Sequence, residues 1–289
     1  MKIIESFKDI LRKFAPPRHD ILGIKQILIS NYLEQNLFRN PRYQDEKKLN
    51  KHEYQVYSQN GEDGIIHEIF KRIGATNKFF VEFGSANGIE CNTLLLLMQD
   101  WKGCWLDGSD ENLKFIKQKF GFMIGKQLSV MKSFITAENI EESFSSLKVP
   151  EEFDLLSIDI DGNDYWVWKA ISSYHPRVVI IEYNSLFPPP IEFIINYDAH
   201  KIYPPTISHF GASLKSLEIL GKKKGYALVG CNFTGTNAFF VRDDLVGDRF
   251  SWPFTAENHH EPVRGFLTMK SGSNRDFGEF MNYDNNLPA

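Results

Sequence analysis

The chain has few of the features that mark secreted, membrane-spanning or nucleic-acid-binding proteins. Its three cysteines are widely spaced and odd in number, which excludes a zinc-type pair and a secreted disulfide framework. A net charge of −4 gives no electrostatic reason to expect nucleic acid as a partner. With 289 residues, 42% of them hydrophobic, the chain is long enough for one large α/β domain with extensions.

The N-terminus, "MKIIESFKDILRKFAPP", has charged residues among its apolar ones. This composition argues against a signal peptide and against a membrane span. The helical spacing of the apolar residues predicts an amphipathic helix that packs on the domain or on a partner subunit, so a homo-oligomer is one option. A helix on a membrane surface is the alternative, but the mixed charges of its polar face disfavour it. We therefore expect a cytoplasmic protein.

Predicted strands and helices alternate along most of the chain. We expect helices at 20–40, 58–73, 111–121, 137–147, 165–174 and 212–225, and strands at 78–84, 103–109, 153–161, 177–185, 226–232 and 237–243, with one more within 122–135. Such alternation predicts a Rossmann-like, doubly wound α/β fold with a mostly parallel sheet. The last two strands, joined by "FTGT", predict an antiparallel hairpin at the sheet edge. We expect an N-terminal helical extension at 1–54, the main domain at 55–245 and a tail of unassigned fold at 246–289.

The segment "FFVEFGSANGIECNTLLLL", residues 79–97, places a glycine loop where the first strand turns into a helix. Ligands of doubly wound sheets bind at this position. The dinucleotide pattern G-x-G-x-x-G is not met, because Ala86 stands two residues after Gly84, and the acid Glu82 would repel a pyrophosphate. A ligand with a positive centre and no phosphate, such as S-adenosylmethionine, would be attracted by Glu82. Asn92 could hold the carboxylate of that cofactor, or could simply cap the next helix.

Asp107 ends the second predicted strand, where an acid can accept hydrogen bonds from both ribose hydroxyls. The alternative role is to cap the following helix, but Ser109 or Asp110 could do that equally well. We assign the neighbouring Gly108, and Ser133 after the third strand, to the same cofactor site.

At these residues the sequence resembles a family. The segment 82–88 looks like the E/D-x-G-x-G-x-G loop of class I S-adenosylmethionine-dependent methyltransferases, with Ala86 in place of the central glycine. The segment 153–171 is similar to the D-x-x-x-x-D-x-E-G motif of the FkbM-type branch, which methylates sugar and natural-product hydroxyls; Asp154, Asp159, Asp161 and Gly162 match it. "YSQNGEDGII" resembles the S-Q-x-x-x-D element of that branch. The resemblance implies the fold, the cofactor and transfer of a methyl group.

The cofactor site that follows draws on several segments. The S-Q-x-x-x-D resemblance implies that Gln59 and Asp63 face the methionine end of the cofactor, although Ser58 could equally serve as a helix N-cap there. The full predicted set is Gln59, Asp63, Glu82, Gly84, Ser85, Asn87, Gly88, Asn92, Asp107, Gly108, Ser133 and Asp159.

Methyl transfer requires alignment of the acceptor oxygen with the methyl carbon and removal of the hydroxyl proton. In one mechanism Asp159 or Asp161 acts as the general base or orients a nearby histidine. In the other, Asp159, Glu182 and Asn184 hold a divalent cation, magnesium or manganese. This set resembles the metal-dependent O-methyltransferases, except that Tyr183 separates the last two ligands. The plainer alternative is that "DIDGND" is a polar turn and that backbone amides satisfy Asp159.

The insert after the fifth strand, residues 187–210, is rich in proline and aromatic residues and carries His200 and His209. We expect it to cover the acceptor, with either histidine as the alternative base. The resemblance favours an O-methyltransferase of a sugar hydroxyl, on a nucleotide-linked sugar or a surface glycan, as in polysaccharide biosynthesis. The alternatives are an N- or O-methyltransferase of a non-sugar molecule, a nucleotide-sugar or NAD-dependent oxidoreductase, and a catalytically silent subunit.

Overall fold

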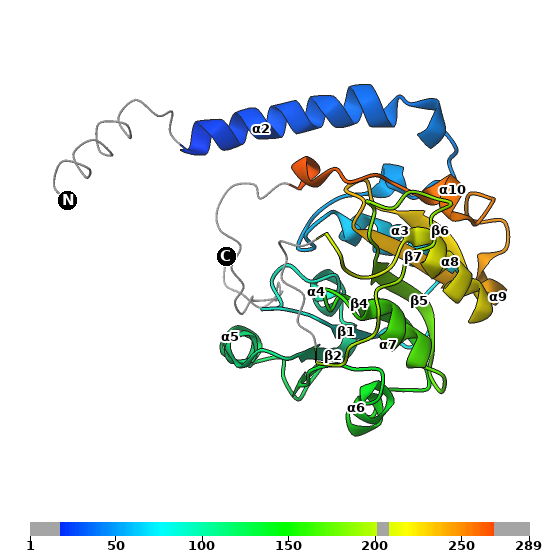
Figure 1. Ribbon diagram of the computed structural model, residues 1–289. Helices are drawn as coiled ribbons and strands as arrows, with labels where there is room; N and C mark the ends of the chain where they lie inside the picture. Colours follow the sequence, from blue (N-terminus) through cyan, green and yellow to red (C-terminus); the bar gives the residue numbers. More distant parts are fainter. Residues whose placement is uncertain (1–17, 201–207, 269–289) are drawn as a thin grey trace, which may run out of the picture.

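A computed structural model of the chain describes residues 18–200 and 208–268 (Figure 1). The amphipathic helix predicted for the first seventeen residues and the end of the tail, 269–289, lie outside the described residues. Within the described ranges, no helix combines the length and the apolar character needed to cross a membrane.

The described residues form one seven-stranded sheet with the strand order β3-β2-β1-β4-β5-β7-β6. The first five strands run parallel, and β7 runs antiparallel to both β5 and β6. This order confirms the Rossmann-like fold and the antiparallel edge hairpin. The strands are β1 (Phe79–Phe83), β2 (Lys102–Asp107), β3 (Leu128–Lys132), β4 (Glu152–Ile158), β5 (His175–Glu182), β6 (Tyr226–Cys231) and β7 (Asn237–Arg242).

Both faces of the sheet are buried. Alternate side chains along a strand point to opposite faces, and an apolar cluster covers each face. In β5, Val179 and Ile181 join one apolar cluster, while Val178 and Ile180 join the other. The first face is covered by α6 (Ile140–Ser146), α7 (Asp164–Ala170) and α8 (Leu214–Lys223). The second face is covered by α3 (Glu62–Ile73), α4 (Leu94–Leu97) and α5 (Asp110–Phe120).

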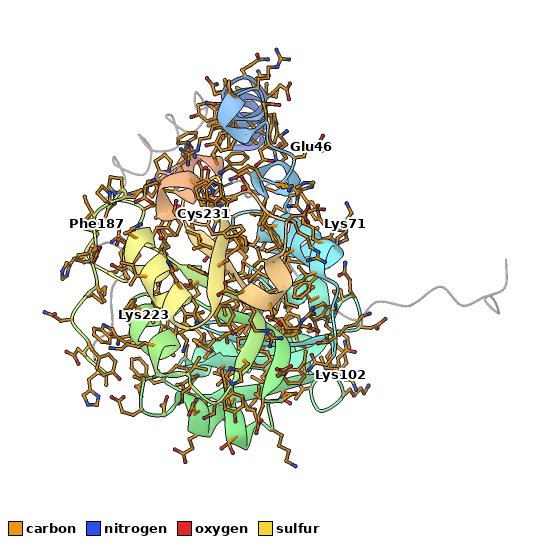
Figure 2. All side chains as sticks on the ribbon, turned by 90° about the vertical axis from the view of Figure 1, so that its right-hand side faces the viewer. Glu46, Lys71, Lys102, Phe187, Lys223 and Cys231 are labelled. Carbon is orange, nitrogen blue, oxygen red and sulfur yellow. The ribbon has the colours of Figure 1, made fainter. Side chains whose placement is uncertain are left out.

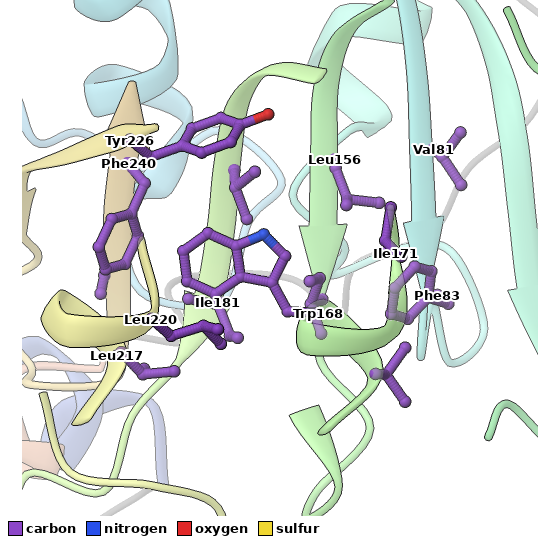
Figure 3. Packing of buried hydrophobic residues seen from close by; sticks show 14 of the residues in the cluster. Val81, Phe83, Leu156, Trp168, Ile171, Ile181, Leu217, Leu220, Tyr226 and Phe240 are labelled. Carbon is purple, nitrogen blue, oxygen red and sulfur yellow. The ribbon is translucent and has the colours of Figure 1, made fainter. Parts of the chain in front are cut away.

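Trp168 lies at the centre of the first cluster, as the helical spacing of α7 predicts. Figure 3 shows its ring between Phe240 and Ile181, and the two aromatic ring centres of Trp168 and Phe240 are 4.8 Å apart. Trp168 is 1% exposed, so its role is packing. Trp166, by contrast, is half-buried, and its indole donates a hydrogen bond to the backbone oxygen of Ile195 in the insert.

The N-terminal segment and the tail pack against each other at one end of the sheet (Figure 1). The N-terminal part contains α2 (Arg18–Tyr32), the π-helix η1 (Leu33–Phe38), η2 (Pro41–Tyr43) and η3 (Asn50–His52); the tail contains α9 (Asp243–Val246), α10 (Ala256–His259) and η4 (Gly265–Leu267). Ile29, Leu37 and Tyr43 share a small apolar cluster with Phe233 and Leu267. The tail, whose fold the sequence left unassigned, is thus fixed to the main sheet by packing.

The helix before β1 begins later than predicted. The helix expected from residue 58 begins at Glu62, and its N-cap is Gly61, with φ +90°. Ser58 instead belongs to a tight turn whose backbone amides, from Val56 to Ser58, donate to one oxygen of Asp63. The residues "SQNG", 58–61, therefore shape a turn before the helix and do not extend it.

Candidate active site

Two cavities lie at the carboxyl ends of the parallel strands. The larger, of about 550 Å³, lies among the ends of β1, β2, β3 and β4. The smaller, of about 170 Å³, lies among the glycine loop, the start of α3 and the start of β7. Gly84, Ala86 and Asp159 line both cavities, so the two are parts of one elongated site. This is the place at which doubly wound folds bind ligands.

The glycine loop adopts left-handed backbone angles at three residues. Gly84 has φ +76°, Ala86 φ +48° and Gly88 φ +80°. Ala86 thus takes a conformation that costs an L-residue energy, at the position where the related loops have glycine. Gly88 lines neither cavity; a side chain there would meet Trp105 at 2.7 Å, so this glycine serves packing.

Glu82 holds the glycine loop to the following helix. One of its oxygens accepts from the amide of Asn92 at 2.8 Å, and the other accepts from the amide and hydroxyl of Thr93 at 3.1 and 2.6 Å. Burial raises the pKa of this carboxyl group, and the hydrogen bonds from Thr93 and Asn92 oppose the rise. Glu82 also lines the smaller cavity, so it contributes negative potential there while its oxygens shape the loop.

Asp107 ends β2 and lines the larger cavity. Its Oδ1 accepts hydrogen bonds from the amide of Ser109 at 2.8 Å and from the side chain of Asn112 at 3.1 Å. The helix cap itself is Ser109, whose hydroxyl accepts from the amide of Asn112. Among the described residues nothing donates to Asp107 Oδ2, which leaves that oxygen available to a ligand.

Three residues that line the two cavities each carry a buried polar atom without a hydrogen-bond partner. The atoms are Ser85 Oγ and Asn237 Oδ1, from residues of the smaller cavity, and Asn163 Oδ1, from a residue of the larger one; within the described part of the chain, only one other such atom exists, Asp63 Oδ1. A buried polar group without a partner costs about 1–3 kcal/mol, so such groups are rare unless a ligand or water satisfies them. Their position marks both cavities as a binding site.

The smaller cavity is rich in carboxylates. Glu62, Glu82, Glu90 and Asp159 all line it, and no lysine, arginine or histidine is among its described lining residues. Glu62 is fully buried and accepts from the amide groups of Asn232 and Asn237, both at 2.8 Å. Burial raises its pKa. This end of the site would attract a cation and repel a phosphate.

Three carboxylates converge beside the cavities. One oxygen each from Asp159, Asp161 and Glu182 lie within 4.8 Å of one another, and none of the three side chains has a hydrogen-bond or ion-pair partner among the described residues. Burial raises the pKa of Asp159 and of Glu182 well above the usual range, and repulsion from neighbouring carboxylates adds to it. Burial also raises the pKa of Asp161, whose φ is +60°.

Asn184, expected beside Glu182, contacts the insert instead. Its amide nitrogen donates to the backbone oxygens of Ser208 and Phe210, at 2.8 and 3.1 Å, and its oxygen accepts from Leu186. Strand β5 ends at Glu182, so the two-residue strand period that would place 182 and 184 on one face does not continue. Asp161, for which the sequence leaves open a role as base or a place in a polar turn, takes the third position of the cluster.

Most of the predicted cofactor residues line the two cavities. They are Gln59, Glu82, Gly84, Ser85, Asn87, Asn92, Asp107, Gly108, Ser133 and Asp159. Asp63, like Gly88, lies outside both; it is 2% exposed, and its Oδ2 holds the turn before α3. Asp154, part of the motif similarity, lies at the opposite end of β4, where it pairs with Arg177 at 2.7 Å.

The two histidines of the insert do not reach the cavities. His200 and His209 are exposed and line none of the cavities described for the chain. The insert itself contacts the site: the backbone oxygen of Asp198 accepts from Asn163, which lines the larger cavity. Figure 2 shows Phe187, at the start of the insert, on the flank opposite Lys71 and Lys102.

Several lining residues were missed by sequence reasoning. Glu62 and Asn237 come from segments 175 residues apart in the sequence, and a hydrogen bond joins them. Phe134, 49% exposed, follows Ser133 in the larger cavity. The rule that ligands bind at strand ends could have identified Phe134 as a lining residue. Asn237 could not be found in this way, because its place in the site depends on the strand register that pairs it with Glu182.

Comparison with known proteins supplies no family assignment. No family model matches the chain, and no curated protein matches it. Among solved structures, the N-terminal domain of EvdMO1 with SAH bound is similar at 16% identity, over 64% of this chain and 80% of that domain, with a TM-score of 0.41. The same domain in the presence of SAH and D-fucose is similar at 15% identity, over 62% of this chain and 80% of that domain, with a TM-score of 0.40. An S-adenosylmethionine-dependent methyltransferase from Clostridium acetobutylicum ATCC 824 is similar at 13% identity, over 61% of this chain and 89% of that chain, with a TM-score of 0.39. The fold class rests on this chain's own strand order and strand directions.

Proposed function

We propose that the protein is an S-adenosylmethionine-dependent O-methyltransferase that acts on a sugar hydroxyl. The observation that carries the proposal is the pairing of the two cavities: one has a free aspartate oxygen at the end of β2, and the other is lined by four carboxylates. An adenosine with a ribose diol fits the first, and a sulfonium with an α-ammonium group fits the second. The binding mode places the ribose at Asp107 and the methionine end near Glu62 and Ser85.

A dinucleotide cofactor fits this arrangement poorly. Its pyrophosphate would lie at the glycine loop, where Glu82 and Asp159 line the site and no described lining residue is cationic. The backbone of the loop also lacks the second glycine that lets a pyrophosphate approach. The charge of the site therefore favours the sulfonium cofactor over the oxidoreductase alternative.

In this proposal Asp159 accepts the proton of the acceptor hydroxyl. This carboxylate lines both cofactor cavities and has no hydrogen-bond partner among the described residues. Its raised pKa, caused by burial first and then by the neighbouring carboxylates, makes it a stronger base than an ordinary aspartate. The insert histidines, both exposed and outside the cavities, are the less favoured base.

As the alternative to Asp159 acting as a free base, we propose that Asp159, Asp161 and Glu182 hold a divalent cation. Three close, unpartnered carboxylates repel one another, and an all-oxygen donor set suits magnesium or manganese. Such a cation lowers the pKa of a hydroxyl bound to it. The residues themselves would fix the acceptor oxygen at the end of β4 and β5, beside the methyl group.

A methyl-transfer assay with labelled S-adenosylmethionine tests the proposal. The protein is incubated with a panel of nucleotide sugars and neutral methyl glycosides, with and without EDTA. Label in a sugar product, identified by mass spectrometry, is the expected result. Tight NAD binding together with no label transfer would contradict the proposal, and transfer to a non-sugar hydroxyl or a nitrogen would retain the cofactor and reject the acceptor.

A further inference from the structure

A third cavity, of about 330 Å³, adjoins the carboxylate cluster. Glu182 lines it, and the carboxylate of Glu182 lies within 4.8 Å of that of Asp159, which lines the two cofactor cavities. Its walls come from three distant segments: residues 182–186 after β5, the turn 234–236 between β6 and β7, and Val263 and Gly265 of the tail. Ser208 and Phe210, at the end of the insert, complete the lining.

We propose that this cavity binds the methyl acceptor and that the tail forms its outer wall. The inference rests on the proposed methyltransferase function. Methyl transfer needs the acceptor oxygen in line with the sulfonium, so the acceptor pocket must meet the cofactor site at one point. The two sites meet at Asp159 and Glu182. Asp159 lines the cofactor cavities, Glu182 lines the third cavity, and their carboxylate oxygens lie within 4.8 Å of each other.

The lining indicates the chemical class of the acceptor. Among the described lining residues Glu182 is the one charged side chain, and it is negative, so a phosphate group would be repelled. The wall combines hydroxyl side chains with apolar ones: Ser185, Ser208, Thr234 and Thr236 with Leu186, Phe210 and Val263. A volume near the lower end of ligand pockets suits a single ring. We therefore assign the cavity to a neutral, hydroxyl-bearing ring such as one sugar unit; any nucleotide or lipid carrier would extend outside it.

The tail wall is built into the fold. Gly235 has φ +75°, and a side chain there would meet the backbone oxygens of Pro262 and Glu261 at 2.6 and 2.8 Å. The amide of Arg264 donates to the backbone oxygen of Thr234 at 2.9 Å. The hydroxyl of Tyr183 donates to the backbone oxygen of Glu261 at 2.7 Å. These contacts join the tail to the turn between β6 and β7 and to the residue after β5, so the wall is formed before any acceptor binds.

Val263 offers a direct test because it lines the cavity and is 53% exposed. All three native cysteines are buried, so a new cysteine at this position can be labelled selectively. We would prepare Val263→Cys and modify it with a bulky maleimide. Methyl transfer to a sugar that the unmodified variant accepts is expected to fall at least about tenfold, while the Kd for S-adenosylmethionine, from calorimetry, stays within about twofold. Asp248→Cys, at a side chain that is 98% exposed and outside the cavities, is the matched control and should keep full activity after labelling.

A second readout does not depend on activity. The rate of maleimide labelling of Val263→Cys is measured with each neutral methyl glycoside and nucleotide sugar of the panel, and slowing by a methyl glycoside supports the pocket. Protection without methylation would support the pocket and reject the proposed reaction. Methylation that is equally fast before and after labelling would reject the pocket and keep the reaction. Neither methylation nor protection by any sugar would overturn both.

Discussion

The backbone oxygen of Asp159 lies 1.4 Å from the point where a side chain at Gly84 would place its Cβ. Strands β1 and β4 thus converge at the centre of the site so closely that position 84 has no room for any side chain. The amide of Gly84 meanwhile donates to the backbone oxygen of Leu106 at 3.0 Å, which ties the loop to β2 as well. The glycine fixes the relative positions of the three strand ends that form the cofactor site.

Gly84→Ala should therefore separate β1 from β4 at the site. We expect a loss of stability of about 1–3 kcal/mol from overpacking and a larger loss of S-adenosylmethionine affinity. Urea unfolding and calorimetry measure the two effects. Gly125→Ala is the matched control, because Gly125 has a similar φ, +80°, but nothing lies within 4 Å of its added Cβ. Equal losses of stability and affinity in the two variants would show that position 84 requires glycine because of its backbone angles alone, and not because of the contact with Asp159.

Asp107→Asn separates the ribose role from the structural one. The asparagine keeps an oxygen that can accept from Ser109, but it loses the charge and the second acceptor. We expect the affinity for S-adenosylmethionine to fall by about 1–3 kcal/mol, with stability changed by less than about 0.5 kcal/mol. Asp110→Asn, in the first turn of α5 and outside the cavities, should bind S-adenosylmethionine normally. Unchanged affinity in Asp107→Asn would remove this residue from the cofactor site.

Several parts of the site that the sequence predicted lie at strand ends. Asp107 and Asp159 were predicted because each of these two strand ends could be located from a short apolar run, and parallel strand ends meet at one edge. Asn184 was assigned to the wrong place because the sequence does not reveal that β5 ends at Glu182 and that the chain then turns toward residues 208 and 210. Glu62 and Asn237 could not be paired, since their contact depends on where α3 packs against β7.

The fold was more predictable than the site for a related reason. Every strand carries apolar residues on both faces, so each strand can be recognised from its own sequence without knowing which strands it pairs with. The position of β7 between β5 and β6 was not specified by any local pattern. It matters for function, because this insertion brings Asn237 opposite Glu182 and places the turn 234–236 in the wall of the third cavity.

The contribution of Asp164 to stability should fall as the pH rises through the weakly acidic range in the presence of EDTA. Burial raises the pKa of Asp164 to about 6, although the amides of Ile160 and Gly162 donate to its carboxylate. Because the folded protein then binds a proton more tightly than the unfolded chain does, this contribution is present below pH 4 and is lost between about pH 4 and 6. Asp164→Asn should lower the slope of unfolding free energy against pH in that window. An identical slope in both proteins would show that Asp164 does not titrate there.

The choice of base can be tested with three variants. Asp159→Asn should reduce turnover by about 10²–10⁴-fold and change cofactor affinity far less. His200→Ala and His209→Ala are expected to keep near-normal turnover, since both histidines are exposed and outside the cavities. Stopped-time assays with labelled S-adenosylmethionine measure all three. A large fall in either histidine variant, with Asp159→Asn active, would return the base to the insert.

Manganese binding gives the last test, and it requires no acceptor. If Asp159, Asp161 and Glu182 hold a divalent cation, manganese should raise the Tm of the wild type, because a ligand that binds only the folded state stabilises it. The rise should be larger at pH 7 than at pH 5, since protons compete for carboxylates whose pKa values burial has raised. Asp161→Asn and Glu182→Gln should each abolish most of the rise, whereas Asp248→Asn, an exposed carboxylate elsewhere, should not. In EDTA, Glu182→Gln should be more stable than the wild type, because the substitution relieves repulsion among the three carboxylates.

If manganese raises the Tm of the wild type and of all three variants equally, it binds elsewhere, and the carboxylate cluster would then act through Asp159 alone.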